Sequence, residues 1–212
     1  MCTYTIVSNN QKIEMKEIIE NRKSAFKAEL NNDLISDTVI IRKNLLHGNP
    51  IIYHEDEEKY FFLKQKVANF FNVSTTKVVM VGSAKLGFSI APKKIWNDFN
   101  EESDIDIVVI SETVFDEYWQ ELLNFNISVK ARSQQEDKNY REFLEYFLKG
   151  WIRPDLFPFN YTKKNEWFEF FKSISYGKYG NYKIAGAIFR NEYFFEQYHS
   201  RNISRLRLEN YE

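Results

Sequence analysis

Two short apolar runs, each bordered by polar residues of a particular kind, constrain the fold of this chain most strongly. Residues 78–81 are followed directly by Gly82 and Ser83. The second run covers residues 105–110; Asp104 precedes it, and Asp106 is its second residue. Valine and isoleucine dominate both runs, which predicts two strands. Because side chains alternate along a strand, residues 104 and 106 point to the same face. We therefore expect two carboxylates side by side at one edge of a sheet.

Such a pair of carboxylates predicts a metal site. Like charges at this spacing repel each other, and a divalent cation relieves the repulsion. Carboxylates combined with substrate phosphates are typical ligands of Mg²⁺, with Mn²⁺ as the substitute. The alternative is that Asp104 and Asp106 are two solvent-facing acids at the start of a strand.

The turn after the first run predicts a phosphate-binding loop. Gly82 and Ser83 offer backbone N–H groups and a hydroxyl, which bind phosphate well. Lys85 follows closely and is a candidate for a second phosphate contact, with a solvated lysine as the alternative. By itself, the Gly-Ser pair is equally compatible with an ordinary turn.

An apolar strand ending in Gly-Ser, followed by Asp-x-Asp on the next strand, resembles the nucleotidyltransferase superfamily typified by DNA polymerase β. The matching residues are Gly82-Ser83 and Asp104-Ile105-Asp106. The stretch between them is longer than in many members of that superfamily. This length predicts an insertion around residues 90–102.

The resemblance also implies a third carboxylate on a later segment, which would complete the metal site and take the acceptor proton. Asp155 is our choice, because it follows the short apolar stretch Trp151-Ile152. Pro154 suits only an edge position in a sheet. The alternative is a turn aspartate paired with Arg153.

What the resemblance implies about function is a Mg²⁺-dependent enzyme that moves a nucleoside monophosphate from a nucleoside triphosphate to an acceptor hydroxyl. ATP is the default donor, and the acceptor is a protein, a tRNA 3′ end, a nucleotide or a small molecule. In that scheme Asp104, Asp106 and Asp155 hold two metal ions, and Gly82, Ser83 and Lys85 hold the triphosphate. The alternative is a catalytically inactive module of the same fold that binds a protein partner in a toxin–antitoxin or defence system.

The composition of the chain limits which partners and which cellular compartment we expect. The chain has 29 basic and 30 acidic residues, so no overall positive charge favours long duplex nucleic acid. A single cysteine, Cys2, excludes an internal disulfide and suits a reducing cytoplasm. The first residues lack the pattern of a signal peptide, and no apolar run reaches 18 residues, so we expect no membrane span.

Periodicity predicts an α/β or α+β domain in which a small mixed sheet is flanked by helices. We expect residues 1–55 to form a helical extension packed on a nucleotidyltransferase-like domain of residues 56–212. Residues 38–42 fit either a short strand or a helical turn, residues 125–130 suggest a strand, and residues 184–189 fit a strand or a buried helix start. Helices are expected at residues 11–31, 56–71, 112–124, 140–148, 163–176 and 190–208.

Overall fold

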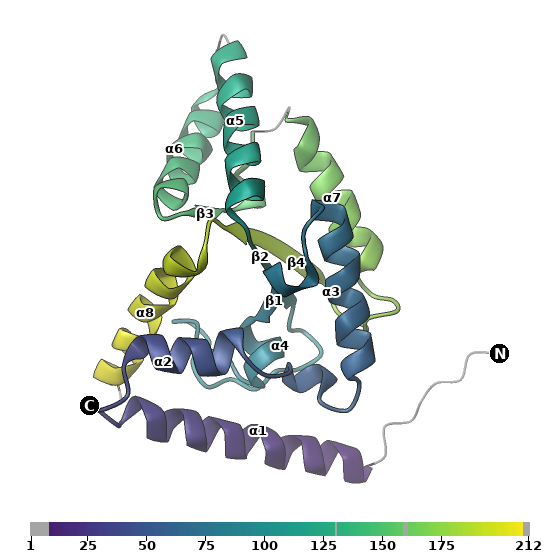
Figure 1. Ribbon diagram of the computed structural model, residues 1–212, viewed down its shortest axis with the longest axis vertical. Helices are drawn as coiled ribbons and strands as arrows, with labels where there is room; N and C mark the ends of the chain where they lie inside the picture. The colour runs from purple at the N-terminus through teal and green to yellow at the C-terminus, as the bar shows by residue number, and fades with distance from the viewer. Residues whose placement is uncertain (1–8, 130, 159–160, 210–212) are drawn as a thin grey trace, which may run out of the picture.

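The fold is described here from a computed structural model, which defines residues 9–129, 131–158 and 161–209. The predicted fold class is confirmed: a small open mixed sheet lies between helices, with α5 and α6 at one end of the molecule and α1 at the other (Figure 1). Cys2 lies outside the described residues. Within them, no helix is both long and apolar enough to cross a membrane.

Four strands form the sheet, in the order β1-β2-β4-β3. β1 runs antiparallel to β2, β2 parallel to β4, and β4 antiparallel to β3. β2 and β4 are thus the central strands, and their register pairs Asp106 with Ala185. The strand bounds are Val78–Val81 for β1, Ile105–Ile110 for β2, Trp151–Ile152 for β3 and Ile184–Phe189 for β4.

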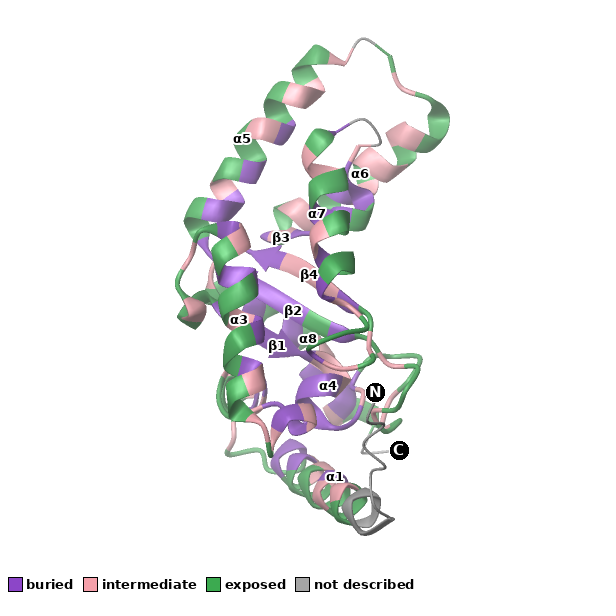
Figure 2. Ribbon diagram, turned by 90° about the vertical axis from the view of Figure 1, so that its right-hand side faces the viewer, coloured by how far each residue is buried: buried purple, intermediate pink, exposed green. Residues whose placement is uncertain are grey.

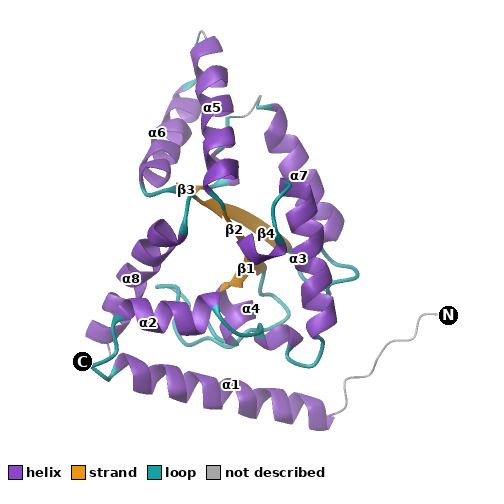
Figure 3. Ribbon diagram, viewed as in Figure 1, coloured by secondary structure: helices purple, strands orange, loops and turns teal. Residues whose placement is uncertain are grey.

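One face of the sheet is covered by four helices, whose apolar side chains form a continuous core with the strands (Figures 1 and 3). The alternation of β2 sends Ile105, Ile107 and Val109 into this core. Trp167 is among the largest fully buried side chains there. We call this side the sealed face; its helices are α3 (Glu57–Phe71), α5 (Glu112–Ser128), α6 (Gln134–Leu148) and α7 (Thr162–Ile174).

The opposite face has a second core, to which the strands contribute Val79, Val81, Val108, Ile110 and Phe189. Here α2 packs against the C-terminal helix, and α1 lies along both of them at the bottom of Figure 1. We call this side the site face, because Asp106 lies on it. Its helices are α1 (Asn9–Leu30), α2 (Asp37–Ile41), α4 (Gly82–Leu86) and α8 (Glu192–Glu209).

Several element boundaries differ from the sequence expectations or resolve their alternatives. Residues 38–42 belong to helical structure, and residues 184–189 form a strand. The strand expected at residues 125–130 is wrong over its described part, because α5 continues to Ser128; residue 130 lies outside the described residues. Phe125 extends the apolar stripe of α5 and packs edge-on against Tyr161, with ring centroids 5.7 Å apart. Tertiary packing thus overrides the strand preference of these few residues.

Serine residues cap the N-termini of α5 and α6, the two helices at the top of Figure 1. The hydroxyl of Ser111 accepts a hydrogen bond from the backbone N–H of Val114 at the start of α5. Ser133 and Glu136 form a reciprocal capping box at the start of α6. Shorter helical turns connect the main elements: η1 (Arg42–Leu46), η2 (Ile51–Tyr53), η3 (Thr75–Lys77) and η4 (Pro154–Leu156).

A long loop joins α4 to β2, in the segment where an insertion was expected. Its two arms are held by backbone hydrogen bonds from Ser89 to Asn97 and from Phe99 to Gly87, each 2.8 Å long. Lys23 of α1 pairs with Asp98 at 2.7 Å and ties the loop to the N-terminal helix. The loop is therefore held between its own two arms and tied to α1.

Candidate functional site

The turn between β1 and α4 lies directly against Asp106. Val81 and Asp106 are partners in the antiparallel register, and Gly82 follows Val81. Gly82 has a φ of +70°, and a Cβ added there would lie 2.9 Å from Oδ2 of Asp106. Glycine is therefore needed for both its backbone angle and its small size. Residues 24 positions apart in the sequence form one compact corner, as the motif predicted.

Asp104 and Asp106 both approach this corner from β2. Asp104 immediately precedes the strand, Asp106 is its second residue, and both side chains reach solvent. The pKa of Asp106 is raised to about 6, mainly by desolvation and also by the charge of Asp104, while Lys183 opposes the shift. The carboxyl of Asp106 is thus crowded by protein on some sides and open to solvent on another. A carboxylate in this position gains from a nearby cation.

Lys183 supplies one positive charge to the pair. It directly precedes β4, and its carbonyl accepts a hydrogen bond of 2.8 Å from the N–H of Ile105. Its Nζ lies 3.2 Å from Oδ2 of Asp104. Sequence patterns did not indicate this contact, because it depends on the parallel pairing of β2 with β4. Recognising residues 184–189 as a strand next to β2 was the signal that could have found it.

The neighbouring central strand offers small side chains beside the aspartates. Ala185 pairs with Asp106 in the register, and Ala187 pairs with Val108, so both alanines lie on the site face. Both are only partly buried, although they belong to a central strand. Part of the surface of β4 beside Asp106 is therefore accessible on the site face.

Asp155 stands apart from the carboxylate pair. It lies in η4 after β3, and β4 separates β3 from β2 in the sheet. Its two carboxyl oxygens accept hydrogen bonds from Arg153, of 3.1 Å from Nε and 2.5 Å from Nη2. Within the described ranges, no group of three or more His, Cys, Asp or Glu side chains is placed to hold a metal ion together. The structure gives Asp155 an ion pair, and its role as third carboxylate stays a prediction.

Lys85 does not point to the corner as the sequence suggested. Its side chain is buried, and Nζ donates to the carbonyl of Gly48. Burial, with the charges of Arg22 and Lys64, lowers the pKa of Lys85 to about 8. These contacts tie α4 to the segment before η2, so we assign Lys85 a structural role. Ser83, one residue after Gly82, is partly exposed and fits the predicted phosphate contact better.

Tyr198 of α8 is a further residue that sequence patterns missed. Its pKa is raised by burial and by the nearby Tyr146 and Asp106, while Asn202 and Arg153 act in the opposite direction. Its ring lies 4.6 Å from that of Trp151 between centroids. The phenol therefore interacts electrostatically with both Asp106 and Arg153.

The residues present suit a magnesium ion that brings its own further ligands. Two carboxylates on one face, one of them desolvated, provide oxygen donors of the kind that Mg²⁺ prefers. Magnesium commonly binds one or two carboxylates and completes its coordination with water and substrate phosphates. The Gly82–Ser83 turn beside Asp106 is where such phosphates would lie.

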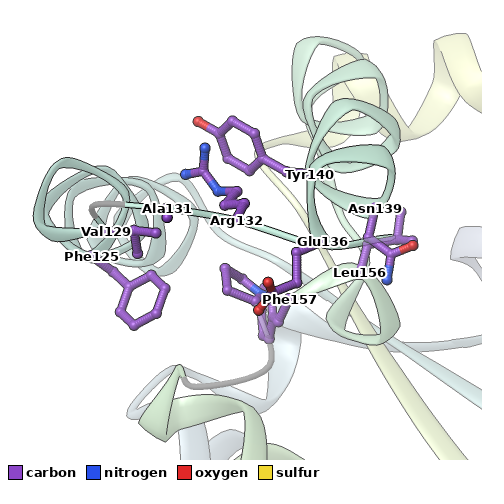
Figure 4. A pocket seen from close by; sticks show the side chains of 10 residues that line it. Phe125, Val129, Ala131, Arg132, Glu136, Asn139, Tyr140, Leu156 and Phe157 are labelled. Atoms are coloured by element: carbon purple, nitrogen blue, oxygen red, sulfur yellow. The ribbon is translucent and has the colours of Figure 1, made fainter. Parts of the chain in front are cut away.

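A separate pocket lies at the far end of the molecule, between the α5–α6 loop and η4 (Figure 4). Arg132 stacks over the ring of Tyr140 at 4.2 Å, and Glu136 is engaged by the cap of α6. None of the predicted site residues contributes to it. Because its polar groups are already paired and no carboxylate pair faces it, we place the candidate site at the β1–α4 corner. The pocket is lined by Phe125, Val129, Ala131, Arg132, Glu136, Asn139, Tyr140, Leu156, Phe157 and Pro158.

Comparison of the chain with protein-family models, with curated proteins and with solved structures found no match. The likeness to nucleotidyltransferases therefore rests on the motif residues and on the geometry of the corner.

Proposed function

We propose that this chain binds a nucleoside triphosphate with Mg²⁺ at the β1–α4 corner and transfers the nucleoside monophosphate to an acceptor hydroxyl. The observation that carries the proposal is the contact of Gly82 with Asp106, with Asp104 on the same face. A phosphate-binding turn and a carboxylate pair are thus joined in one place. A triphosphate with its metal ion needs both features at once.

Each residue has a distinct task in this proposal. Gly82 lets the backbone approach the phosphates, and Ser83 donates its hydroxyl to one of them. Asp104 and Asp106 would hold the metal ion, which when bound neutralises charge on the phosphates and on the attacking oxygen. The acceptor would approach over the partly exposed Ala185 and Ala187.

The donor and acceptor follow from chemistry rather than from a recognised partner. ATP is the first donor to test, and a protein, a tRNA 3′ end, a nucleotide or a small molecule can supply the hydroxyl. The near-zero net charge of the chain argues against long duplex nucleic acid. We further propose a cytoplasmic setting, which suits a chain with one cysteine.

The second candidate is a module that binds the metal–nucleotide complex, or a protein partner, without transfer. The pairing of Ala185 with Asp106 favours it, because no carboxylate from the adjacent strand faces the pair at that position. The ion pair of Asp155 with Arg153 points the same way.

Two measurements separate these functions. Calorimetry with each nucleoside triphosphate and Mg²⁺ should detect binding to the wild-type chain, and Asp106→Asn should weaken it at least about tenfold. Incubation with each α-³²P-labelled triphosphate, Mg²⁺ and cell extract should then label an acceptor. Binding without labelling supports the second candidate. If the wild-type chain binds no triphosphate, the nucleotide-binding proposal is lost.

A further inference from the structure

Lys183 places a positive charge beside the carboxylates. Its ammonium group lies 3.2 Å from Oδ2 of Asp104, and its charge is also felt by Asp106. The backbone hydrogen bond between Ile105 and Lys183 fixes the start of the lysine side chain at the edge of the site. Without a metal ion, the chain thus neutralises part of its own carboxylate pair.

The contact is easily exchanged. The side chains of Lys183 and Asp104 are 57% and 45% exposed, so solvent screens their attraction. Lysine is also a compact charge on a flexible stem, and it can turn to another anion while its backbone stays fixed. An incoming metal ion alone meets a positive charge at Asp104. A metal ion that arrives with a triphosphate also brings an anion to which the ammonium group can move.

Resting on the function proposed above, we propose that Lys183 is an internal counter-ion that makes the site select a metal–polyphosphate complex over the free metal ion. In the ligand-free chain, Lys183 pairs with Asp104. When the complex binds, the lysine leaves Asp104 and pairs with a phosphate. Metal and nucleotide therefore bind synergistically: each strengthens the binding of the other, and Lys183 provides part of that coupling.

Electron paramagnetic resonance of Mn²⁺ tests the inference without measuring activity. Free Mn²⁺ is titrated with the protein, alone and with α,β-methylene-ATP, whose bridging carbon prevents transfer. The variants are Lys183→Gln and, as a control of equal charge change, Lys178→Gln. Lys178 lies on the same loop but stacks over Phe62 at 4.8 Å. A third variant, Asp104→Asn, removes one of the proposed ligands.

We expect Lys183→Gln to bind Mn²⁺ alone about 5- to 20-fold more tightly than the wild type, because a like charge near the ion is removed. The nucleotide analogue should then increase its Mn²⁺ affinity by a smaller factor than in the wild type. Lys178→Gln should match the wild type in both titrations. Equal Mn²⁺ affinities in the two lysine variants overturn the counter-ion role.

A second outcome overturns only the proposed move of Lys183 from Asp104 to a phosphate. If Lys183→Gln binds Mn²⁺ more tightly but the analogue strengthens that binding as much as in the wild type, the lysine does not reach the phosphate. Failure of the proposed function looks different: the wild type then binds no Mn²⁺–analogue complex, and Asp104→Asn changes nothing. The two failures are therefore distinguishable in one series of titrations.

Discussion

The two faces of the central sheet are built from alternate residues of the same strands, yet they differ in what they allow. On the sealed face, Ile184 and Ile188 of β4 are buried beneath helices. On the site face, Ala185 and Ala187 remain partly exposed beside Asp106. Figure 2 shows part of β4 in the colour of intermediate burial. Because side chains alternate with a period of two, one strand serves both the core and the candidate site. Coverage by helices, and not strand composition alone, decides where ligand chemistry can occur.

Gly186 shows how closely the sealed face is packed. A Cβ added to this residue would lie 2.1 Å from Cζ of Phe171, well inside the ring's contact distance. Here the missing side chain makes room for a helix residue. On the other face, the small side chains of its neighbours leave room for solvent or a ligand. The residues of this stretch are thus small for a different physical reason on each face of the sheet.

The largest expected effect comes from filling the sealed face. Gly186→Val should lower the free energy of unfolding by about 3 kcal/mol or more, because Phe171 cannot move aside within a packed core. Ala185→Val, one residue away on the site face, should cost less than about 1 kcal/mol. Urea denaturation of both variants measures the difference. Equal losses would contradict the contrast between the faces.

Gly82→Ala should give the next largest effect. Both Gly82 and Gly48 have a φ of +70°, but only Gly82 has a neighbour where a Cβ would be, namely Asp106. The backbone angle alone should cost each alanine variant about 1–2 kcal/mol. Gly82→Ala should in addition displace Asp106 and weaken nucleotide binding about tenfold or more. Calorimetry should show normal nucleotide binding by Gly48→Ala. Equal weakening in both variants would contradict a specific role of Gly82 in nucleotide binding.

Local patterns in the sequence predicted the corner of the site well. The apolar runs before Gly82 and after Asp104 define β1 and β2, and the antiparallel pairing of two successive strands brings their ends together. The face shared by the two aspartates follows from strand geometry alone. The possible pairing of Asp155 with Arg153 was also visible, since the two residues are close neighbours in the chain.

Long-range contacts account for what the sequence did not reveal. Lys85 is buried because Gly48, 37 residues earlier, supplies its acceptor. Lys183 meets Asp104 only through the parallel register of β2 and β4, across 79 residues. No periodicity within a short window contains such information. In the helical stretch 125–128, Phe125 likewise packs against Tyr161, which is far away in the sequence.

Replacing Asp106 should change the stability of the chain by an amount that depends on pH, unlike a replacement of the apolar residues around it. Its pKa is raised from 3.8 to about 6 in the folded chain, so folding favours its protonated form. The associated stabilisation is present below pH 3.8 and is lost as the pH rises through 6. Asp106→Asn should therefore stabilise the chain at pH 8 by about 1 kcal/mol after allowance for solvent screening, and by less at pH 4. Thermal unfolding at both pH values, without divalent ions, measures this; an equal effect at the two pH values would contradict the shift.

The smallest expected effect concerns Asp155, at the far side of β4 from the aspartates. In its ion pair, the side chain of Arg153 is 28% exposed and that of Asp155 is 52% exposed. Asp155→Asn should therefore lower the free energy of unfolding by less than about 1 kcal/mol. Arg153 should keep its place, because it also lies 4.6 Å from the Tyr146 ring. Binding of Mg²⁺ and nucleotide should be unchanged, since Asp104, Asp106 and Gly82 are untouched. Calorimetry and the labelling assay on this variant sharpen the comparison: loss of labelling with intact binding would establish Asp155 as the third carboxylate, and a loss of binding would contradict the placement of the site at the β1–α4 corner alone.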